Sequence, residues 1–425
     1  MSIKSIFLSR SSLDFSYMFC ANLIKKGFGF IREIVLAFFF GSEILYANFL
    51  LLKTSSDIFS QFTQGSALQA NLLSFFSKAY EKEASVSLKS VVVFAKSISW
   101  KIFLVSQIIQ IPLVIYISPD SYILFLMISM TLGIVIASNF FSSIFFIIFQ
   151  AKGEFKKFSI STTIDMFMST VLIYPLLKVF GVIGIVFSRI AGISILIYKY
   201  FVPMFKETKG EEIKLGFKDI NFSILLLGNF AHIIMFISRF VAGLDDGNNI
   251  TFFNYSIVLL NVFMTAIIMN LNTIVLKKLS NSKDFKLIVF SFLISLALGL
   301  ILVFVIDIYG FNIIQFIFQR GAFTSQDTQQ TYLYAKDLSF SFVFIFISSV
   351  LFQPFFSLDQ NIIKKDSKVM ALLLLATTLI LLLYFIVVPA SSRVNSIIML
   401  YTLSVVSVLL SLFSLVKYVK YNKVN

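Results

Sequence analysis

The sequence predicts an all-α, polytopic membrane protein, and its composition and long apolar runs carry that prediction. Of 425 residues, 58% are hydrophobic and 13% charged, whereas a soluble domain has about 25% charged residues. The mean hydropathy is +0.93. No soluble core buries so much apolar surface, so the bilayer is the expected solvent. The apolar runs are too long for the short alternating strands of a membrane barrel.

Twelve segments are long enough to cross a bilayer, which takes roughly 20 residues of helix. The predicted spans are 13–40, 44–75, 90–117, 121–150, 155–179, 181–205, 217–243, 250–276, 285–309, 330–357, 367–389 and 394–416. Segments 44–75 and 330–357 are amphipathic and give the weakest apolar signal. No small-residue cleavage site follows the first segment, so we expect it to be retained.

The distribution of basic residues predicts the orientation. If the N-terminus is cytoplasmic, the inner pieces carry 22 lysines and arginines, and the outer side carries only Lys178, Arg320 and Arg393. Cytoplasmic loops of membrane proteins are enriched in these residues. Both termini are therefore predicted to be cytoplasmic. The net charge of +14 is explained by topology, and a nucleic-acid partner is excluded.

A polar linker divides the chain into two halves. KETKGEEIKLGFKD follows the sixth predicted span. We predict an N-lobe at 1–205, a cytoplasmic linker at 206–218 and a C-lobe at 219–425. Arg32 and Arg239 each stand near the outer end of the first helix of a lobe, before a Gly-containing loop. This echo indicates a parallel repeat of the kind found in many transporters.

Enzyme and cofactor signatures are missing from the sequence. The single cysteine, Cys20, leaves no internal disulfide or cysteine-based metal site, and the single histidine, His232, is read as a packing residue. There is no P-loop, zinc spacing or G-x-S-x-G motif. We predict no cofactor, no catalytic residues and no enzymatic activity.

The first predicted span contains cations. In NLIKKGFGFIREIV, Lys25 and Arg32 are two helical turns apart and share a face, while Lys26 and Glu33 share the neighbouring face. A cation at mid-membrane costs about 3 kcal/mol on insertion scales. These residues therefore face a wet cavity, or else they snorkel or pair internally. The nearby glycines leave room for a bulky ligand or a close helix contact.

Other charges lie in later spans. Lys53 and Asp57 are four residues apart, which fits an ion pair within one helix or a face turned to water. Asp165 and Asp307 are candidates for ion or proton binding, or for pairing with a cation. Cations outnumber acids within the spans, which favours an anionic ligand such as phosphate. The cations concerned are Lys25, Lys26, Arg32, Lys53, Lys96, Lys101, Arg189 and Arg239.

Several stretches resemble the MurJ/MviN family over about residues 13–370. They are KKGFGFIREIVLAFFFG with its continuation ANFLLLK and FTQGSALQANLLSFFSKAYEKE, then SRFVAG, FQRGAFTSQDTQQT and FQPFFSLDQNIIK. The resemblance implies the MATE-like fold of the multidrug/oligosaccharidyl-lipid/polysaccharide exporter (MOP) superfamily, with two six-helix lobes around a cationic cavity.

The resemblance also implies a function. Members of this family and its relatives flip polyprenyl-pyrophosphate-linked saccharides, such as lipid II or O-antigen and capsule units, across the bacterial inner membrane. The implied partners are a lipid-linked oligosaccharide, membrane lipids and cell-envelope biosynthesis enzymes, with the chain acting as a monomer. A multidrug or cation antiporter of the same superfamily is the alternative. A membrane polymerase or ligase and a non-transporting scaffold are further rivals.

Family positions transfer residue by residue. Arg32 stands at the arginine of the G-F-x-R-D motif, Lys26 falls where a cavity arginine is usual, and Lys53 matches the lysine of the second helix. Ser256 falls where the family usually has an arginine, and two further helices typical of lipid II flippases are missing from the predicted spans. We therefore expect Lys25, Lys26, Arg32, Lys53 and Arg239 to bind pyrophosphate, with Asp57 and Asp165 as candidates for ion or proton coupling.

Overall fold

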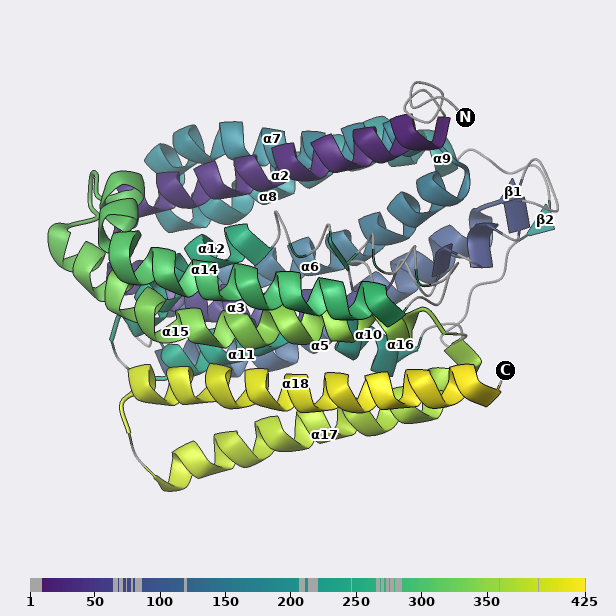
Figure 1. Ribbon diagram of the computed structural model, residues 1–425. Coiled ribbons are helices and arrows are strands. Elements are labelled where there is room, and N and C mark those ends of the chain that lie inside the picture. The colour runs from purple at the N-terminus through teal and green to yellow at the C-terminus, as the bar shows by residue number, and fades with distance from the viewer. Residues whose placement is uncertain are drawn as a thin grey trace. The chain divides into compact units, whose positions relative to one another are not determined.

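The computed structural model is helical almost throughout (Figure 1). It describes residues 10–63, 68, 72–73, 75–77, 79–80, 86–117, 121–205, 211–212, 221–245, 247–264, 268, 271–272, 275, 279, 285–358, 360–388 and 390–424. Most of the predicted linker, 206–218, lies outside these residues. The prediction of an all-α membrane protein is confirmed. The one addition is a parallel pairing of two-residue strands, β1 (Val86–Ser87) and β2 (Glu211–Glu212).

The chain forms two compact units. The first comprises Met1–Val35 and Ser55–Asn221, and the second comprises Leu36–Thr54 and Phe222–Asn425. The boundary after residue 221 lies close to the predicted linker. The segment 36–54, however, packs with the second unit although it belongs to the predicted N-lobe.

The first unit contains the predicted spans of the N-terminal half. Its helices are the first part of α2 (Arg10–Phe40), the second part of α3 (Ile44–Thr63), α5 (Lys89–Ile117), α6 (Tyr122–Ala151), α7 (Phe155–Phe180), α8 (Gly184–Leu196) and α9 (Val202–Phe205). A short 3₁₀ turn, Gly181–Ile183, joins α7 to α8, and a π-helical turn, Ile197–Phe201, joins α8 to α9. A Cβ on Gly184 would lie 2.4 Å from the Leu176 carbonyl oxygen. Glycine therefore lets these two helices pack closely.

The second unit contains α10 (Phe222–Gly228), α11 (Phe230–Ala242), α12 (Asn249–Phe263), α14 (Phe285–Phe318), α15 (Ser325–Leu351), α16 (Gln353–Phe356), α17 (Gln360–Val387) and α18 (Ser392–Val424), together with the ends of α2 and α3. The predicted span 217–243 is broken at Asn229, where α10 and α11 meet at 75°. Helices α14, α15, α18 and α17 lie side by side in that order (Figure 1).

Membrane-spanning character is clear for most of these helices. Within the described residues, seven helices are long and apolar enough to cross a membrane, or eight if the bent pair counts as one span. The helix Phe155–Phe205 in this count contains two of the predicted spans. Parts of predicted spans 44–75 and 250–276 lie outside the described residues, so the count of twelve stays a prediction.

Burial differs sharply among the helices of the second unit. The apolar windows of α14 and α17 are 28% and 22% buried, whereas that of α15 is 83% buried. Helix α15 gave a weak apolar signal because it carries many serines and threonines. These side chains bond to other protein groups: Ser348 donates to the Phe344 carbonyl at 2.8 Å, and Ser407 of α18 donates to Ser348 at 3.0 Å. A helix enclosed by protein tolerates such residues, whereas one facing lipid does not.

Candidate functional site

Three helices of the first unit, α2, α7 and α8, lie side by side (Figure 1). Helix α2 carries the cations of the first predicted span. The rings of Phe28 and Phe167 lie 5.3 Å apart, and the Thr170 hydroxyl donates to the Phe28 carbonyl at 3.3 Å. Arg32 is 8% exposed and its Nη2 donates to the Ile185 carbonyl of α8 at 3.1 Å. These contacts fix the cationic face of α2 against α7 and α8.

An ion pair connects α7 and α8 next to this face. Arg189 Nη1 lies 3.7 Å from Asp165 Oδ2, and their side chains are 19% and 13% exposed. Lys25 interacts electrostatically with both residues and with Lys26. Asp165 is therefore a shared counterion for cations on two helices. A Cβ on Gly192 would lie 2.8 Å from Asp165 Oδ1, so α8 approaches the carboxylate closely because this residue is glycine.

The cluster has an excess of positive charge. Its cations are Lys25, Lys26, Arg32 and Arg189, and its acids are Asp165 and Glu33. Lys25 is half-buried and Lys26 is exposed, so both side chains are accessible to a ligand. A Cβ on Gly27 or Gly29 would meet nothing within 4 Å. These glycines border open space rather than a close helix contact, which leaves room for a bulky anion.

Comparisons with known proteins bear on the fold. No family model and no curated protein matches the chain. Among solved structures, the lipid II flippase MurJ in an inward closed conformation matches with a TM-score of 0.72 and 16% identity, over 93% of this chain and 86% of that one. The chain has the fold of a MOP-superfamily transporter.

Multidrug transporters show the same fold with lower similarity. An inward-facing multidrug resistance MATE family transporter of the MOP superfamily matches with a TM-score of 0.58 and 13% identity, over 95% of both chains. An outward-facing MATE transporter matches at 0.55 and 12%, again over 95% of both. The predicted MurJ-like MOP fold is confirmed. At these identities the likeness is one of fold alone.

Within this MOP fold, the predicted site residues fall into separate groups. Lys25, Lys26, Arg32 and Asp165 belong to the cluster in the first unit. Lys53 and Asp57 are half-buried on successive turns of α3, where the chain passes from the second unit into the first. Arg239 is 4% exposed in the second unit. Its Nε donates to Thr54 Oγ1 and its Nη1 to Asn254 Oδ1, each at 2.7 Å.

The pairing of Arg189 with Asp165 was not predicted from the sequence, where the two residues are far apart and Arg189 stands alone in its helix.

A second missed feature is a buried polar network in the first unit. Gln110 of α5 donates to Ser56 of α3, and Ser129 of α6 donates to Gln110 at 3.0 Å and Gln107 at 3.2 Å. Gln107 and Gln110 lie one turn apart in an apolar helix, and this spacing is the sequence signal that could have indicated the network.

Metal binding has no support in the described part of the chain. Among those residues, no group of three or more His, Cys, Asp or Glu side chains could hold a metal ion. The chemistry of the cluster is that of lysine and arginine, which bind oxyanions by charge and hydrogen bonds.

Proposed function

We propose that the chain is a flippase that moves a polyprenyl-pyrophosphate-linked saccharide across the bacterial inner membrane by alternating access. The observation that carries this proposal is the surplus of cations where α2, α7 and α8 meet. Lys25 and Arg189 share the carboxylate of Asp165, Arg32 lies on the same face of α2 as Lys25, and Lys26 lies on the neighbouring face. A pyrophosphate would supply the negative charge that the cluster lacks. The MOP fold supports the proposal because the MurJ structure is that of a lipid II flippase.

Each group of residues has a role in this proposal. Lys25, Lys26 and Arg32 bind the pyrophosphate, and Lys53 and Arg239 contribute further positive charge during the cycle. Asp165 holds the cations while no substrate is bound, and Asp57 and Asp165 are the candidates for ion or proton coupling. Net positive charge could also couple movement to the membrane potential, which is worth about 2.3 kcal/mol per charge per 100 mV. The lipid tail stays in the bilayer.

The division of the chain also supports alternating access. Residues 36–54, the outer ends of the first two helices, belong to the second unit, whereas the rest of both helices belongs to the first. A transporter that opens to the other side must release or re-pack such a segment. Alternating access requires no cofactor and no chemical step, so we propose a transporter rather than an enzyme, working as a monomer alongside cell-envelope biosynthesis enzymes.

A lipid-binding measurement tests the proposal. The full chain is reconstituted in liposomes, and binding of undecaprenyl pyrophosphate is measured for wild type, Lys25→Gln, Lys26→Gln and the control Lys96→Gln. Lys96 is an exposed lysine of another helix, α5. Loss of one charge-assisted contact costs about 1.5–3 kcal/mol, which predicts roughly 10- to 100-fold weaker binding for Lys25→Gln and Lys26→Gln. The control Lys96→Gln should bind the lipid as tightly as the wild type. Equal affinities in all four proteins would show that Lys25 and Lys26 do not bind the pyrophosphate.

The alternative is a multidrug or cation antiporter, which the likeness to MATE transporters favours. Such a protein would use the acids Asp57 and Asp165 to bind cations. In the same liposomes, affinity for an organic cation that falls in Asp165→Asn, together with no binding of the pyrophosphate lipid, would establish the alternative.

A further inference from the structure

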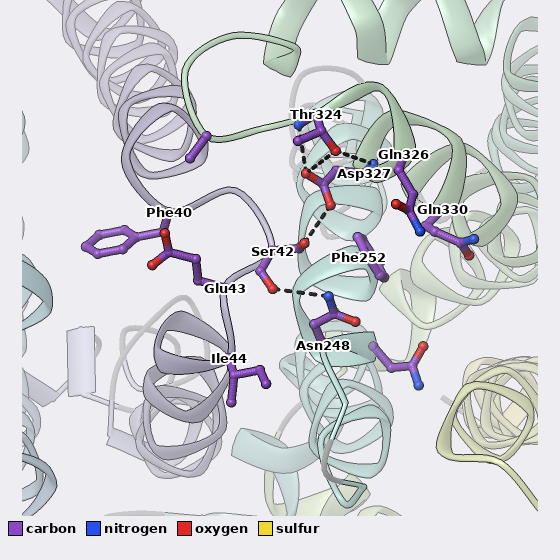
Figure 2. A pocket seen from close by; sticks show the side chains of 12 residues that line it. Phe40, Ser42, Glu43, Ile44, Asn248, Phe252, Thr324, Gln326, Asp327 and Gln330 are labelled. Atoms are coloured by element: carbon purple, nitrogen blue, oxygen red, sulfur yellow. Dashed lines mark hydrogen bonds between the residues drawn. The ribbon is translucent and has the colours of Figure 1, made fainter. Parts of the chain in front are cut away.

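A polar cavity of about 570 Å³ lies in the second unit (Figure 2). It is bordered by the α2–α3 turn, the start of α12 and the start of α15. Its lining residues are Phe40, Ser42, Glu43, Ile44, Asn248, Asn249, Phe252, Ala322, Thr324, Gln326, Asp327 and Gln330. Small-molecule sites usually have volumes of about 300–1,000 Å³. The cavity is therefore large enough for one or two sugar rings.

Some of these residues build a rigid wall. Thr324 and Asp327 form a capping box at the start of α15, with Asp327 Oδ2 accepting from the Thr324 amide at 2.7 Å. Asp327 Oδ1 accepts from the Ser42 hydroxyl, and Asn248 Nδ2 donates to the Ser42 carbonyl at 3.2 Å. Figure 2 shows these bonds joining the turn after α2 to α15 and to the start of α12. Both carboxylate oxygens of Asp327 therefore already accept hydrogen bonds from protein groups, so we assign Asp327 a structural role.

Other lining side chains present ligand-binding groups. Gln326 and Gln330 lie four residues apart on the first turns of α15 and so share a face (Figure 2). Gln326 and Glu43 are exposed, and Gln330 is half-buried. Amides and a carboxylate bind hydroxyl groups as both donors and acceptors. Phe40 and Phe252, which are almost fully buried, form part of the apolar lining.

The lining also excludes other ligands. It contains no lysine or arginine, and Glu43 and Asp327 would repel a phosphate. The predicted topology places these turns on the outer side, where a delivered headgroup would arrive. We propose that this cavity binds the neutral, hydroxyl-rich saccharide part of the substrate. The assignment of the sugar to a lipid-linked substrate rests on the proposed function, but the binding chemistry does not.

Saturation-transfer-difference NMR on the full chain in nanodiscs tests this site. The probes are glucose, galactose, rhamnose, N-acetylglucosamine and chitobiose, without lipid or phosphate. The variants are Gln326→Ala/Gln330→Ala and the control Gln329→Ala, an exposed glutamine of the same helix that does not line the cavity. We expect at least one sugar to bind, about tenfold more weakly in the double variant, because two hydrogen bonds are lost, and unchanged in the control.

Three results would overturn the site: no binding of any probe, equal binding by all three proteins, or calcium binding that depends on Glu43 without sugar binding. Failure of the proposed function would look different. Sugar binding that depends on Gln326 and Gln330, with no binding of undecaprenyl pyrophosphate, would support the saccharide site and contradict the flippase proposal. Pyrophosphate binding that depends on Lys26, without sugar binding, would do the reverse.

Discussion

Three arginines in apolar helices are each held by a different kind of partner. Arg32 donates to a backbone carbonyl of another helix, Arg189 pairs with a carboxylate, and Arg239 is bound by a hydroxyl and an amide oxygen. Charged groups in the bilayer are tolerated when protein atoms replace water around them. Each arginine is thus held by its neighbours. Lys25, which interacts with Asp165 and Arg189, and the adjacent Lys26 remain the groups best placed to bind an incoming anion.

Removing the carboxylate of Asp165 should destabilise the first unit. Asp165→Asn leaves Arg189 and Lys25 without their shared counterion, and breaking a partly buried pair of this kind costs about 2 kcal/mol after allowance for solvent screening. The control is Glu154→Gln, which breaks an exposed pair with Lys157 whose side chains are 32% and 60% exposed. The midpoint temperature of thermal unfolding should fall by several degrees in Asp165→Asn and should not change in Glu154→Gln. An equal effect in both would show that Asp165 is not a shared counterion.

Replacing Arg239 by lysine tests the value of its planar guanidinium. Lysine keeps the charge but cannot reach Thr54 and Asn254 in the same fork geometry, so we expect a loss of about 2 kcal/mol in stability. Arg320→Lys is the matched control, because Arg320 is exposed and donates to the Phe316 carbonyl near the end of α14, the helix that it follows. The midpoint of thermal unfolding distinguishes the two. A stable Arg239→Lys protein would mean that charge alone is required there.

At the scale of elements, the turn after α2 and the turn before α15 meet through two glycines. A Cβ on Gly41 would lie 2.3 Å from the Ala322 carbonyl oxygen, and a Cβ on Gly321 would lie 2.3 Å from the Phe38 carbonyl oxygen. Both glycines have positive φ, +49° and +63°. The Ala322 amide donates to the Phe38 carbonyl at 2.9 Å between them. This glycine contact holds the segment 36–54 in the second unit.

Alanine at either glycine should open this contact. Gly41→Ala and Gly321→Ala each combine backbone strain of about 1–3 kcal/mol with a direct clash. We expect a Ser42→Cys reporter, in a Cys20→Ser background, to react faster with a polar maleimide in both variants. Gly29→Ala is the control, since its Cβ would meet nothing within 4 Å. Unchanged labelling in all three proteins would show that the glycine contact does not close this end.

At the scale of the whole molecule, charge separates the two ends of the second unit. The turns at one end carry Glu43, Asp245 and Asp327 and are joined by hydrogen bonds, including Asn249 Nδ2 to Ser392 Oγ at 3.2 Å. The other ends of α17 and α18 carry lysines, and Lys417 pairs with Asp366 at 3.0 Å. The positive-inside rule predicts that the lysine end is cytoplasmic.

Cysteine labelling in intact cells tests this orientation. In a Cys20→Ser background, Leu244→Cys introduces a thiol at the acidic end and Lys365→Cys introduces one at the basic end, both at exposed positions. We expect a membrane-impermeant maleimide to label only Leu244→Cys until the membrane is permeabilised. The opposite labelling pattern would reverse the topology and place the saccharide cavity on the cytoplasmic side.

The sequence predicted much of the architecture because a membrane-spanning helix depends on the apolar character of consecutive residues. Apolar length gave spans that match helices such as α5, α6 and α7 within a few residues. The predicted span 330–357 began five residues after the start of α15 at Ser325, where Thr324 and Asp327 form a capping box. The prediction failed to show the break at Asn229, because a bend that neighbouring helices stabilise leaves no mark in hydropathy.

The sequence by itself determined the membrane class, the helical fold and the presence of cations in the first span. Those properties depend on composition and on contacts within a helix. Only the tertiary structure decided that Asp165 pairs with Arg189 beside Lys25, that Arg239 is bound by Thr54 and Asn254, and that Gln326 and Gln330 face a cavity with Glu43. Each of these depends on side chains distant in sequence, whose approach is set by how helices pack and where glycine lets backbones meet.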